Sequence, residues 1–377
     1  MKLVYLDNAA TTKMSKRVIE EMIESFENIY GNPSSTHTLG QKAKAVVENA
    51  RHIVAKNLKV EAKEIVFTSG GAEGNNLVIK GFLKQNKDKG KHIITTKIEH
   101  STVLKTFESL EKQGYDVTYI DVTKDGIIDV EKLKKAVRKD TALVSVMFVN
   151  NETGVIQPIK KIGEFLKEKE IFFHTDAVQA IGKFEIYPKE LRIDALTVSS
   201  HKFYGPKGTG FVFIDKKYNI EKEIFGGSQE RNRRAGTENV NGILGTGVAL
   251  EEVYEKMEVI FEHEKKIQEY LEEKLKNEIG RIQKVEINGE NSRRVKNITN
   301  VFIENTDIQM LLVALDMRGI CVSGGSACMS GSLENSYVLE AMGLNDEKLK
   351  SSFRISIGKD TTIEEIDYFI ENLKEII

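Results

Sequence analysis

The sequence has few of the features that mark specialised protein classes. Its 377 residues include two cysteines, four prolines and no tryptophan. Two cysteines exclude a disulfide framework, fit reduced thiols and argue against a closed thiolate zinc site within one chain. The formal net charge is −2, so the chain lacks the basic excess of nucleic-acid or anionic-membrane binders.

Long apolar runs are absent as well. No stretch approaches the roughly 20 apolar residues of a membrane helix, and Asp7 interrupts the apolar N-terminal stretch too early for a signal peptide. We therefore expect no membrane partner, no direct nucleic-acid partner and a cytoplasmic location. The remainder is typical of a globular protein, with 40% hydrophobic and 30% charged residues and a length that favours two domains.

Short apolar runs alternate with amphipathic segments from about residue 60 to 215. This pattern predicts an α/β fold with a mostly parallel, seven-stranded central sheet covered by helices on both faces. The predicted strands are residues 64–68, 91–95, 115–120, 142–148, 171–175, 195–198 and 210–214. Helices are expected to begin near Ala72 and at Ser101. Ligands of such sheets bind at the carboxyl ends of the strands.

The pattern becomes helical from Asn239 to Asn277, which we interpret as a connection to a second domain. The tail then predicts strands at 297–303 and 353–357, a helix near 307–318, and a final helix that begins near Thr362 with a capping-box sequence. We expect a large domain of residues 15–255 and a smaller α+β domain formed by residues 1–14 plus 256–377.

Lys202 stands where the apolar run of residues 195–198 opens into a loop with Gly205 and Pro206. A lysine in partly desolvated surroundings loses its proton more readily and becomes a nucleophilic amine. Such an amine can form a Schiff base with pyridoxal phosphate. A lysine that merely ends a strand in water is the competing interpretation, so other residues must support the first one.

Two further strand ends carry residues suited to such a cofactor. The amides of Gly71 and Ala72, at the start of a predicted helix, can hold a phosphate, although a plain glycine turn is the alternative. Asp176 can keep a pyridinium nitrogen protonated, or it can be a structural residue that caps a helix or turn.

Three more side chains point to the same chemistry. His100 can stack on a flat cofactor and exchange protons near neutral pH. Asn151 follows the predicted strand of residues 142–148 and offers an amide group at the same edge of the sheet. Arg354 is a charge among apolar neighbours and needs an anionic partner. A substrate carboxylate suits its forked guanidinium group, and a structural salt bridge is the alternative.

The two cysteines differ in their surroundings. Cys328 is at the centre of residues 323–332, a segment dominated by small residues that we expect to be mobile and exposed. An accessible thiol of this kind is a candidate nucleophile. Cys321 lies in an apolar run and is expected to be buried and inert.

The sequence resembles the cysteine desulfurases, class V of the fold-type I pyridoxal-phosphate enzymes. The resemblance covers essentially the whole chain and is to the long-loop group of nitrogen-fixation and housekeeping iron–sulfur types. The motifs that carry it are residues 5–12, 31–35, 150–154, 176–179, 200–208, 226–231, 234–239 and 326–328. Together these motifs are specific, whereas any one alone is not. The short-loop, selenocysteine-active variant of the motif around the cysteine is absent.

The resemblance implies a set of roles for this chain. It implies that Lys202, His100 and Cys328 are catalytic, and that Cys328 attacks the substrate sulfur and becomes a persulfide. The implied pyridoxal-phosphate site comprises Gly71, Ala72, His100, Asn151, Asp176, Gln179, Ser199, His201, Lys202 and Thr237. Thr237 reaches the neighbouring subunit of a homodimer, and Asn32 and Arg354 bind the substrate carboxylate. The implied reaction converts L-cysteine to L-alanine and supplies sulfur to an iron–sulfur scaffold or another acceptor protein.

Two positions depart from the family pattern. Ala72 replaces a common threonine, so one hydroxyl contact to phosphate is missing, and Met329 replaces a small hydroxyl residue after Cys328.

An aminotransferase, a β-eliminating lyase and a cofactor-binding protein without turnover are the alternative functions. Iron–sulfur assembly, tRNA thiolation and cofactor synthesis all stay open as the destination of the sulfur. We expect no intrinsic metal site, although Cys328 can be a shared iron–sulfur ligand with a scaffold partner.

Overall fold

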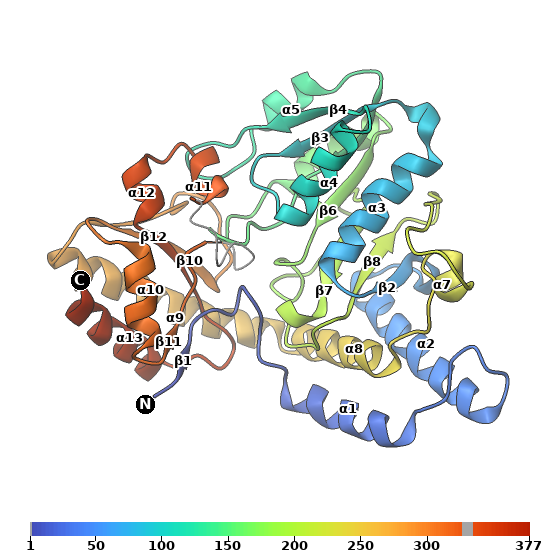
Figure 1. The fold of residues 1–377 in the computed structure, drawn as a ribbon, viewed down its shortest axis with the longest axis horizontal. Helices are drawn as coiled ribbons and strands as arrows, with labels where there is room; N and C mark the ends of the chain where they lie inside the picture. Colours follow the sequence, from blue (N-terminus) through green and yellow to red (C-terminus); the bar gives the residue numbers. More distant parts are fainter. Residues whose placement is uncertain (1, 326–334) are drawn as a thin grey trace.

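A seven-stranded sheet forms the centre of the computed structural model, which describes residues 2–325 and 335–377 (Figure 1). Its strands are β2 (Ile65–Thr68), β3 (His92–Thr96), β4 (Asp116–Ile120), β5 (Thr141–Ser145), β6 (Phe172–Asp176), β7 (Ala195–Ser199) and β8 (Gly210–Ile214). The strand order is β2-β8-β7-β6-β5-β3-β4. Strand β8 is antiparallel to both neighbours and the other pairs are parallel. The predicted mostly parallel, seven-stranded sheet is confirmed.

Strand β5 ends at Ser145, three residues earlier than predicted. The amides of Val146 and Phe148 still donate to carbonyl oxygens of β6, at 3.1 and 2.9 Å. The chain then turns because the Asn150 side chain accepts hydrogen bonds from the amides of Glu152 and Thr153, both at 3.0 Å. Such a side-chain turn competes with a regular ladder, and it places Asn151 beside the carboxyl end of the sheet.

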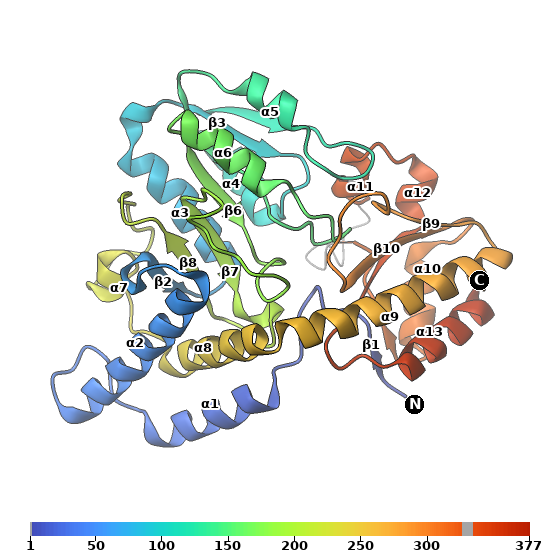
Figure 2. The ribbon, with the colours of Figure 1, turned by 180° about the vertical axis from the view of Figure 1, so that it is seen from behind.

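Helices cover both faces of the sheet, as Figures 1 and 2 show from opposite sides. Helices α3 (Gly71–Gln85) and α4 (Ser101–Glu111) begin where the sequence predicts and share a core with one face. Helices α2 (Thr38–Leu58), α6 (Ile159–Glu168) and α8 (Val240–Glu255) pack on the other face. The remaining helices of this part are α1 (Lys16–Asn28), α5 (Val130–Ala136) and the short α7 (Gln229–Asn232).

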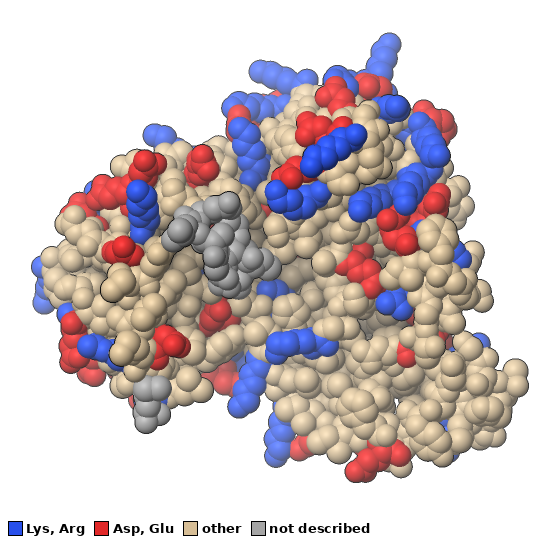
Figure 3. Space-filling view, viewed as in Figure 1, with Lys and Arg blue, Asp and Glu red and all other residues tan. Residues whose placement is uncertain are grey.

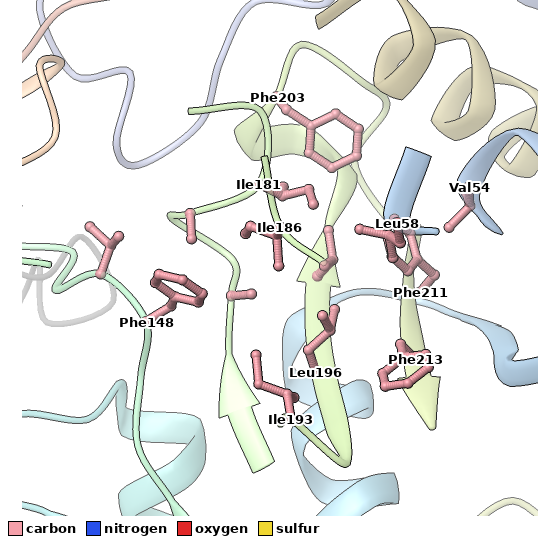
Figure 4. Close-up of a cluster of buried hydrophobic side chains, with 14 of the residues drawn as sticks. Val54, Leu58, Phe148, Ile181, Ile186, Ile193, Leu196, Phe203, Phe211 and Phe213 are labelled. Carbon is pink, nitrogen blue, oxygen red and sulfur yellow. The ribbon is translucent and has the colours of Figure 1, made fainter. Parts of the chain in front are cut away.

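The core on the α2 side reaches the loop that carries Lys202. Figure 4 shows Leu196, Phe211 and Phe213 of the central strands beside α2. Phe203 belongs to the same cluster and is 1% exposed. Burial of one such side chain stabilises the fold by about 1.5–3 kcal/mol, so the residue directly after Lys202 fixes the position of that loop.

The predicted helical stretch of residues 239–277 consists of two helices, α8 and α9 (Met257–Asn277), which meet at Lys256. Figure 2 shows α9 extending from the region of α8 to a second group of elements. That group comprises β1 (Val4–Tyr5), β9 (Val285–Ile287), β10 (Ile298–Ile303), α10 (Ile308–Asp316), β11 (Ile320–Cys321), α11 (Tyr337–Ala341), α12 (Asp346–Lys350), β12 (Ser352–Ser356) and α13 (Ile363–Ile376). The predicted capping box at Thr362 is present at the start of α13.

A second hydrophobic core lies within this group of elements. It joins Val4 and Leu6 of the N-terminal segment to buried residues between Ile267 and Leu373. Strand β1 is held there because it pairs with β11 in parallel register. These contacts support our proposal of a large domain of residues 15–255 and a small domain of 1–14 plus 256–377.

Candidate active site

Lys202 is the last residue of a short helical turn, η3 (Ser200–Lys202), that follows β7 directly. Its Nζ donates hydrogen bonds to the carbonyl oxygens of Ala9 and Ala10, at 2.6 and 2.7 Å. The side chain is half-buried. The amine therefore lies at the carboxyl end of the sheet, in the partly desolvated setting that the sequence predicts.

The N-terminal segment connects Lys202 to other predicted site residues. The Gln179 side-chain amide donates to the same Ala9 carbonyl at 2.8 Å. The amide of Thr12 donates to the carbonyl of His201 at 2.8 Å, and the His201 Nδ1 lies 3.1 Å from the Thr11 hydroxyl. Burial, together with Lys202 and Lys207, lowers the pKa of His201 to about 4, so this imidazole is neutral at pH 7.

Asp176 is the last residue of β6 and its side chain is buried. Its Oδ2 accepts a hydrogen bond from Asn75 Nδ2 at 2.8 Å, and its Oδ1 accepts one from the amide of Val178 at 3.0 Å. Two fixed donors hold the carboxyl group at the same sheet edge as Lys202. This arrangement suits a partner for a protonated ring nitrogen.

His100 is the N-cap of α4. Its Nδ1 accepts a hydrogen bond from the amide of Thr102 at 3.2 Å and lies 2.9 Å from the Thr102 hydroxyl oxygen. Because a backbone amide always donates, Nδ1 carries no proton here. The neutral imidazole of His100 therefore carries its proton on Nε2.

The start of α3 has the features of a phosphate site. Gly70, at the N-cap, provides no side-chain cap and has φ of +142°, a conformation that favours glycine. A Cβ at Gly70 would lie 3.3 Å from Ser199 Oγ, and one at Gly71 would lie 3.1 Å from Val178. Ala72 is exposed. Helix-start amides beside a serine hydroxyl fit a phosphate group, and the two glycines keep that space open.

Arg354, in β12, is 1% exposed and has protein partners. Its Nη2 pairs with Asp7 Oδ1 at 2.8 Å, and its Nη1 donates to the Asn151 carbonyl at 2.8 Å. The structural salt bridge of the alternative interpretation is therefore present. Among the described residues, the buried Arg354 Nε and Asn151 Oδ1 have no hydrogen-bond partner. A donor left unmet in this way can still take a substrate carboxylate.

Asn32 and Thr237 lie apart from this network within one chain. Asn32 is exposed in the turn between α1 and α2, and its Oδ1 accepts from the amide of Ser34 at 2.9 Å. Figures 1 and 2 show that turn at the opposite end of the molecule from β12, so the structure does not bring Asn32 to Arg354. Thr237, after α7, is also exposed.

Of the two cysteines, the structure describes Cys321 but not Cys328. Cys321, in β11, is half-buried rather than buried as predicted, because β11 pairs with β1 in a two-stranded sheet. Burial and two nearby carboxylates, Asp316 and Asp7, raise the pKa of its thiol, which disfavours the nucleophilic thiolate. Cys328 and Met329 lie outside the residues that the structure describes.

Three contributors to the site were not predicted. Asn75 and Thr102 link Asp176 to His100, and the Ala9 carbonyl links Lys202 to Gln179. Asn75 had a signal in the sequence, because asparagine is unfavourable inside a helix and here follows a phosphate-type turn. A backbone carbonyl leaves no such signal.

Comparisons with known proteins fit this site. A family model described as aminotransferase class-V matches residues 4–369. The chain is 48% identical over 378 residues to the cysteine desulfurase IscS of Clostridium botulinum. The aligned region covers 100% of this chain and 94% of that protein. The chain belongs to the cysteine desulfurase family. The desulfurase is a pyridoxal-phosphate enzyme of fold-type I, and the predicted family, fold and cofactor are confirmed.

Other relatives agree with this assignment. The cysteine desulfurase IscS of Methanosarcina thermophila is 46% identical over 380 residues, covering 100% of this chain and 92% of that protein. A solved NifS-like protein superposes on the desulfurase with a TM-score of 0.93 at 38% identity, covering 100% of this chain and 99% of that one.

Proposed function

We propose that this desulfurase removes the sulfur atom of L-cysteine, releases L-alanine and stores the sulfur as a persulfide on Cys328. The observation that carries the proposal is the full-length similarity to cysteine desulfurases. The site supports it because Lys202, Asp176 and His100 all belong to loops or strand ends at the carboxyl edge of one sheet.

The residues present fit pyridoxal phosphate, which supplies an electron sink for the substrate Cα when it is bound. Lys202 would hold the cofactor covalently and Asp176 would hold its ring nitrogen. Gly71, Ala72, Ser199 and His201 would hold the phosphate, with Thr237 of a second subunit. His100 would stack on the ring, and Asn151 and Gln179 would contact its hydroxyl side.

Sulfur transfer balances without an external oxidant. The Cys328 thiolate attacks the substrate sulfur, so that an S–S bond forms and the Cβ–S bond breaks. The bonding electron pair stays with the substrate carbon, which takes up a proton and becomes the methyl group of alanine. The products are alanine and one persulfide. His100 holds a proton at Nε2, and Lys202 can carry a second one at Nζ.

The guanidinium group of Arg354 is our proposed contact for the substrate carboxylate. It is buried, held by Asp7 and the Asn151 carbonyl, and keeps its Nε without a partner among the described residues. Asn32 is proposed to act at the site of a second copy, since it is remote from Arg354 in its own chain.

We further propose that the active unit is a homodimer formed through the α1 end of the molecule. Helix α1 and the following turn expose Ile19, Ile23, Phe26 and Tyr30, with exposed fractions from 40% to 73%. Figure 3 shows few charged side chains over this corner of the molecule. Asn32 and Thr237 are exposed, as expected for residues that act across an interface. Phe26→Glu should give a monomer by light scattering, whereas Met310→Glu, at an exposed position on α10, should leave the dimer intact.

A mixing experiment tests whether Thr237 completes a partner's site. Alone, Lys202→Ala is expected to be inactive and Thr237→Ala to be weakly active. When the two are unfolded and refolded together, mixed dimers combine Lys202 of one subunit with Thr237 of the other. Recovered activity would support the shared site, and no recovery from properly assembled mixed dimers would overturn it.

An iron–sulfur scaffold or another sulfur-acceptor protein is our proposed partner, in the cytoplasm. Within residues 2–325 and 335–377, none of the helices combines the length and apolar character needed to cross a bilayer. Mass spectrometry of proteins that receive labelled sulfur from the persulfidated enzyme would identify the acceptor.

Product analysis tests the reaction itself. Wild-type enzyme with L-cysteine should release alanine. Pyruvate and ammonia as the main products would instead identify a β-eliminating lyase. Lys202→Ala should lose the visible absorption of the bound cofactor and all turnover, and retention of both would contradict the proposal.

A further inference from the structure

A chain of hydrogen bonds runs from the carboxyl group of Asp176 to the imidazole of His100. Asn75 Nδ2 donates to Asp176 Oδ2 at 2.8 Å and to Thr102 Oγ1 at 2.9 Å. Thr102 Oγ1 lies 2.9 Å from His100 Nδ1. Residues from the end of β6 and from the starts of α3 and α4 are thereby connected through two side chains.

The chemistry of the groups fixes the direction of every bond in this chain. Asp176 presents an oxygen acceptor, so the Asn75 amide must turn its nitrogen toward it, and the second hydrogen of that nitrogen then points to Thr102. Because the Thr102 oxygen accepts from Asn75, its own hydrogen is left for His100 Nδ1. The Thr102 amide also donates to Nδ1, at 3.2 Å. The hydroxyl and the amide of Thr102 thus both donate to Nδ1, which places the His100 proton on Nε2.

The position of Asn75 is costly for a residue that only packs. Its side chain is 0% exposed, and its Oδ1 is buried with no partner among the described residues. An unmet buried acceptor destabilises the folded state, and asparagine has low helix propensity. Its neighbour Asn76, by contrast, returns its Nδ2 to the carbonyl of Ala72 at 2.9 Å within α3. The orientation of Asn75 is determined by Asp176 and Thr102 rather than by its own helix.

We propose that Asn75 is a positioning residue of the desulfurase reaction, which acts through Asp176 and, with Thr102, through His100. It holds the Asp176 carboxyl group in place and directs the Thr102 hydroxyl to His100 Nδ1, so that His100 presents its Nε2 proton. The inference rests on the proposed function and deepens it. Neither Asn75 nor Thr102 itself needs to touch substrate or cofactor.

The test compares Asn75→Ala, Thr102→Val and the double variant with two matched controls. Thr106→Val removes a hydroxyl one turn later on α4, where it bonds the Thr102 carbonyl and Asn76. Asn76→Ala removes the adjacent amide. In the holoenzyme, Asn75→Ala and Thr102→Val should lower kcat by about 10–100-fold, the size of a lost positioning contact, with KM for cysteine within about threefold. The double variant should lose no more than the worse single variant, because both break one chain.

A second measurement is independent of turnover. Nitrogen-15 spectra of histidine-labelled protein, with His100 assigned by its loss in His100→Gln, report which ring nitrogen is protonated. Wild type and both controls should show the Nε2–H form. Asn75→Ala and Thr102→Val should move the Nδ1 resonance, since Nδ1 loses an oriented donor.

The outcomes separate this inference from the proposed function. Single variants that match the controls in kcat and in the His100 resonances would overturn the role of Asn75, while desulfurase activity itself would stand. Fully additive losses in the double variant would also overturn it. If Asn75→Ala fails to fold, Thr102→Val at a half-buried position decides the test by the same criteria.

Discussion

The buried ion pair between Arg51 and Glu230 gives a quantitative prediction about the segment that leads to Thr237. The two side chains are 3% and 2% exposed, and the guanidinium and carboxylate groups meet in two bonds of 2.7 and 2.8 Å. The same carboxylate accepts the amide of Phe67 at 2.9 Å. Glu230, Arg231 and Asn232 all have positive φ, from 46° to 64°, so the ion pair holds an unfavourable backbone conformation in place.

Glu230→Ala should therefore destabilise the protein strongly. It leaves the Arg51 charge buried without its main partner, which costs about 3–5 kcal/mol, and it removes the acceptor of the Phe67 amide. Arg231→Ala is the matched control, because its exposed contacts to Glu48 and the Ala62 carbonyl contribute at most about 1 kcal/mol. Urea unfolding, followed by circular dichroism, measures both differences.

A paired replacement isolates the cause. Arg51→Met combined with Glu230→Leu removes both charges and should recover most of the loss, since apolar pairs of similar volume often replace buried ion pairs without a penalty. The expected loss is large because the ion pair is buried. A Glu230→Ala variant whose free energy of unfolding lies within about 1 kcal/mol of wild type would therefore refute this prediction. A double variant less stable than Glu230→Ala would also refute it. Because Arg234 of this segment bonds Glu73 at the start of α3 (3.0 Å), Glu230→Ala should also weaken binding of pyridoxal phosphate.

Three further predictions concern the site. Arg354→Lys should raise KM for cysteine about 10–100-fold, or about 1.4–2.8 kcal/mol, because a single ammonium nitrogen cannot reproduce the three nitrogens of the planar guanidinium fork. An unchanged KM in steady-state assays, or the same KM rise in Asp7→Asn, would contradict a substrate contact. Gly70→Ala should weaken binding of pyridoxal phosphate about tenfold (about 1.4 kcal/mol) in titrations of the apoenzyme, since its Cβ would approach Ser199 Oγ to 3.3 Å. Gly114→Ala is the control, because Gly114 has a positive φ but open space around it. An equal loss of affinity in both variants would contradict the role of Gly70 at the phosphate site. Burial raises the pKa of Glu99 from 4.5 to about 8, so between these pH values the folded state keeps a proton that the unfolded state releases. The free energy of unfolding therefore falls as the pH rises from 4.5 to about 8, by up to about 1.4 kcal/mol per pH unit. Glu99→Gln should reduce this fall in thermal unfolding between pH 5 and pH 8, and a pH dependence identical to that of wild type would contradict the prediction.

The sheet was predictable because its strands are continuous apolar runs that parallel, doubly covered sheets require. Short strands such as β1 and β11, of two residues each, carry no such pattern and form only because distant segments meet. The same reason explains the site. Lys202 and Asp176 stand at readable strand ends, whereas the Ala9 and Ala10 carbonyls reach Lys202 across more than 190 residues.

Arg354 shows a different limit of sequence reasoning. A buried arginine signals an anionic partner, but the sequence alone left both a substrate carboxylate and a protein carboxylate open as that partner. The structure supplies Asp7 as one partner and leaves Nε unmatched among the described residues. Long-range pairing with the first residues of the chain supplied a partner that the local sequence pattern could not predict.

Direct detection of the persulfide tests the central claim that Cys328 accepts sulfur from L-cysteine. Wild-type enzyme treated with L-cysteine, then alkylated and digested, should carry one added sulfur atom on the peptide that contains Cys328, matched by release of one alanine. Cys328→Ser should bind the cofactor normally, carry no added sulfur and release no alanine above background. Alanine release at the wild-type rate from Cys328→Ser, or added sulfur on Cys321 instead, would contradict the account.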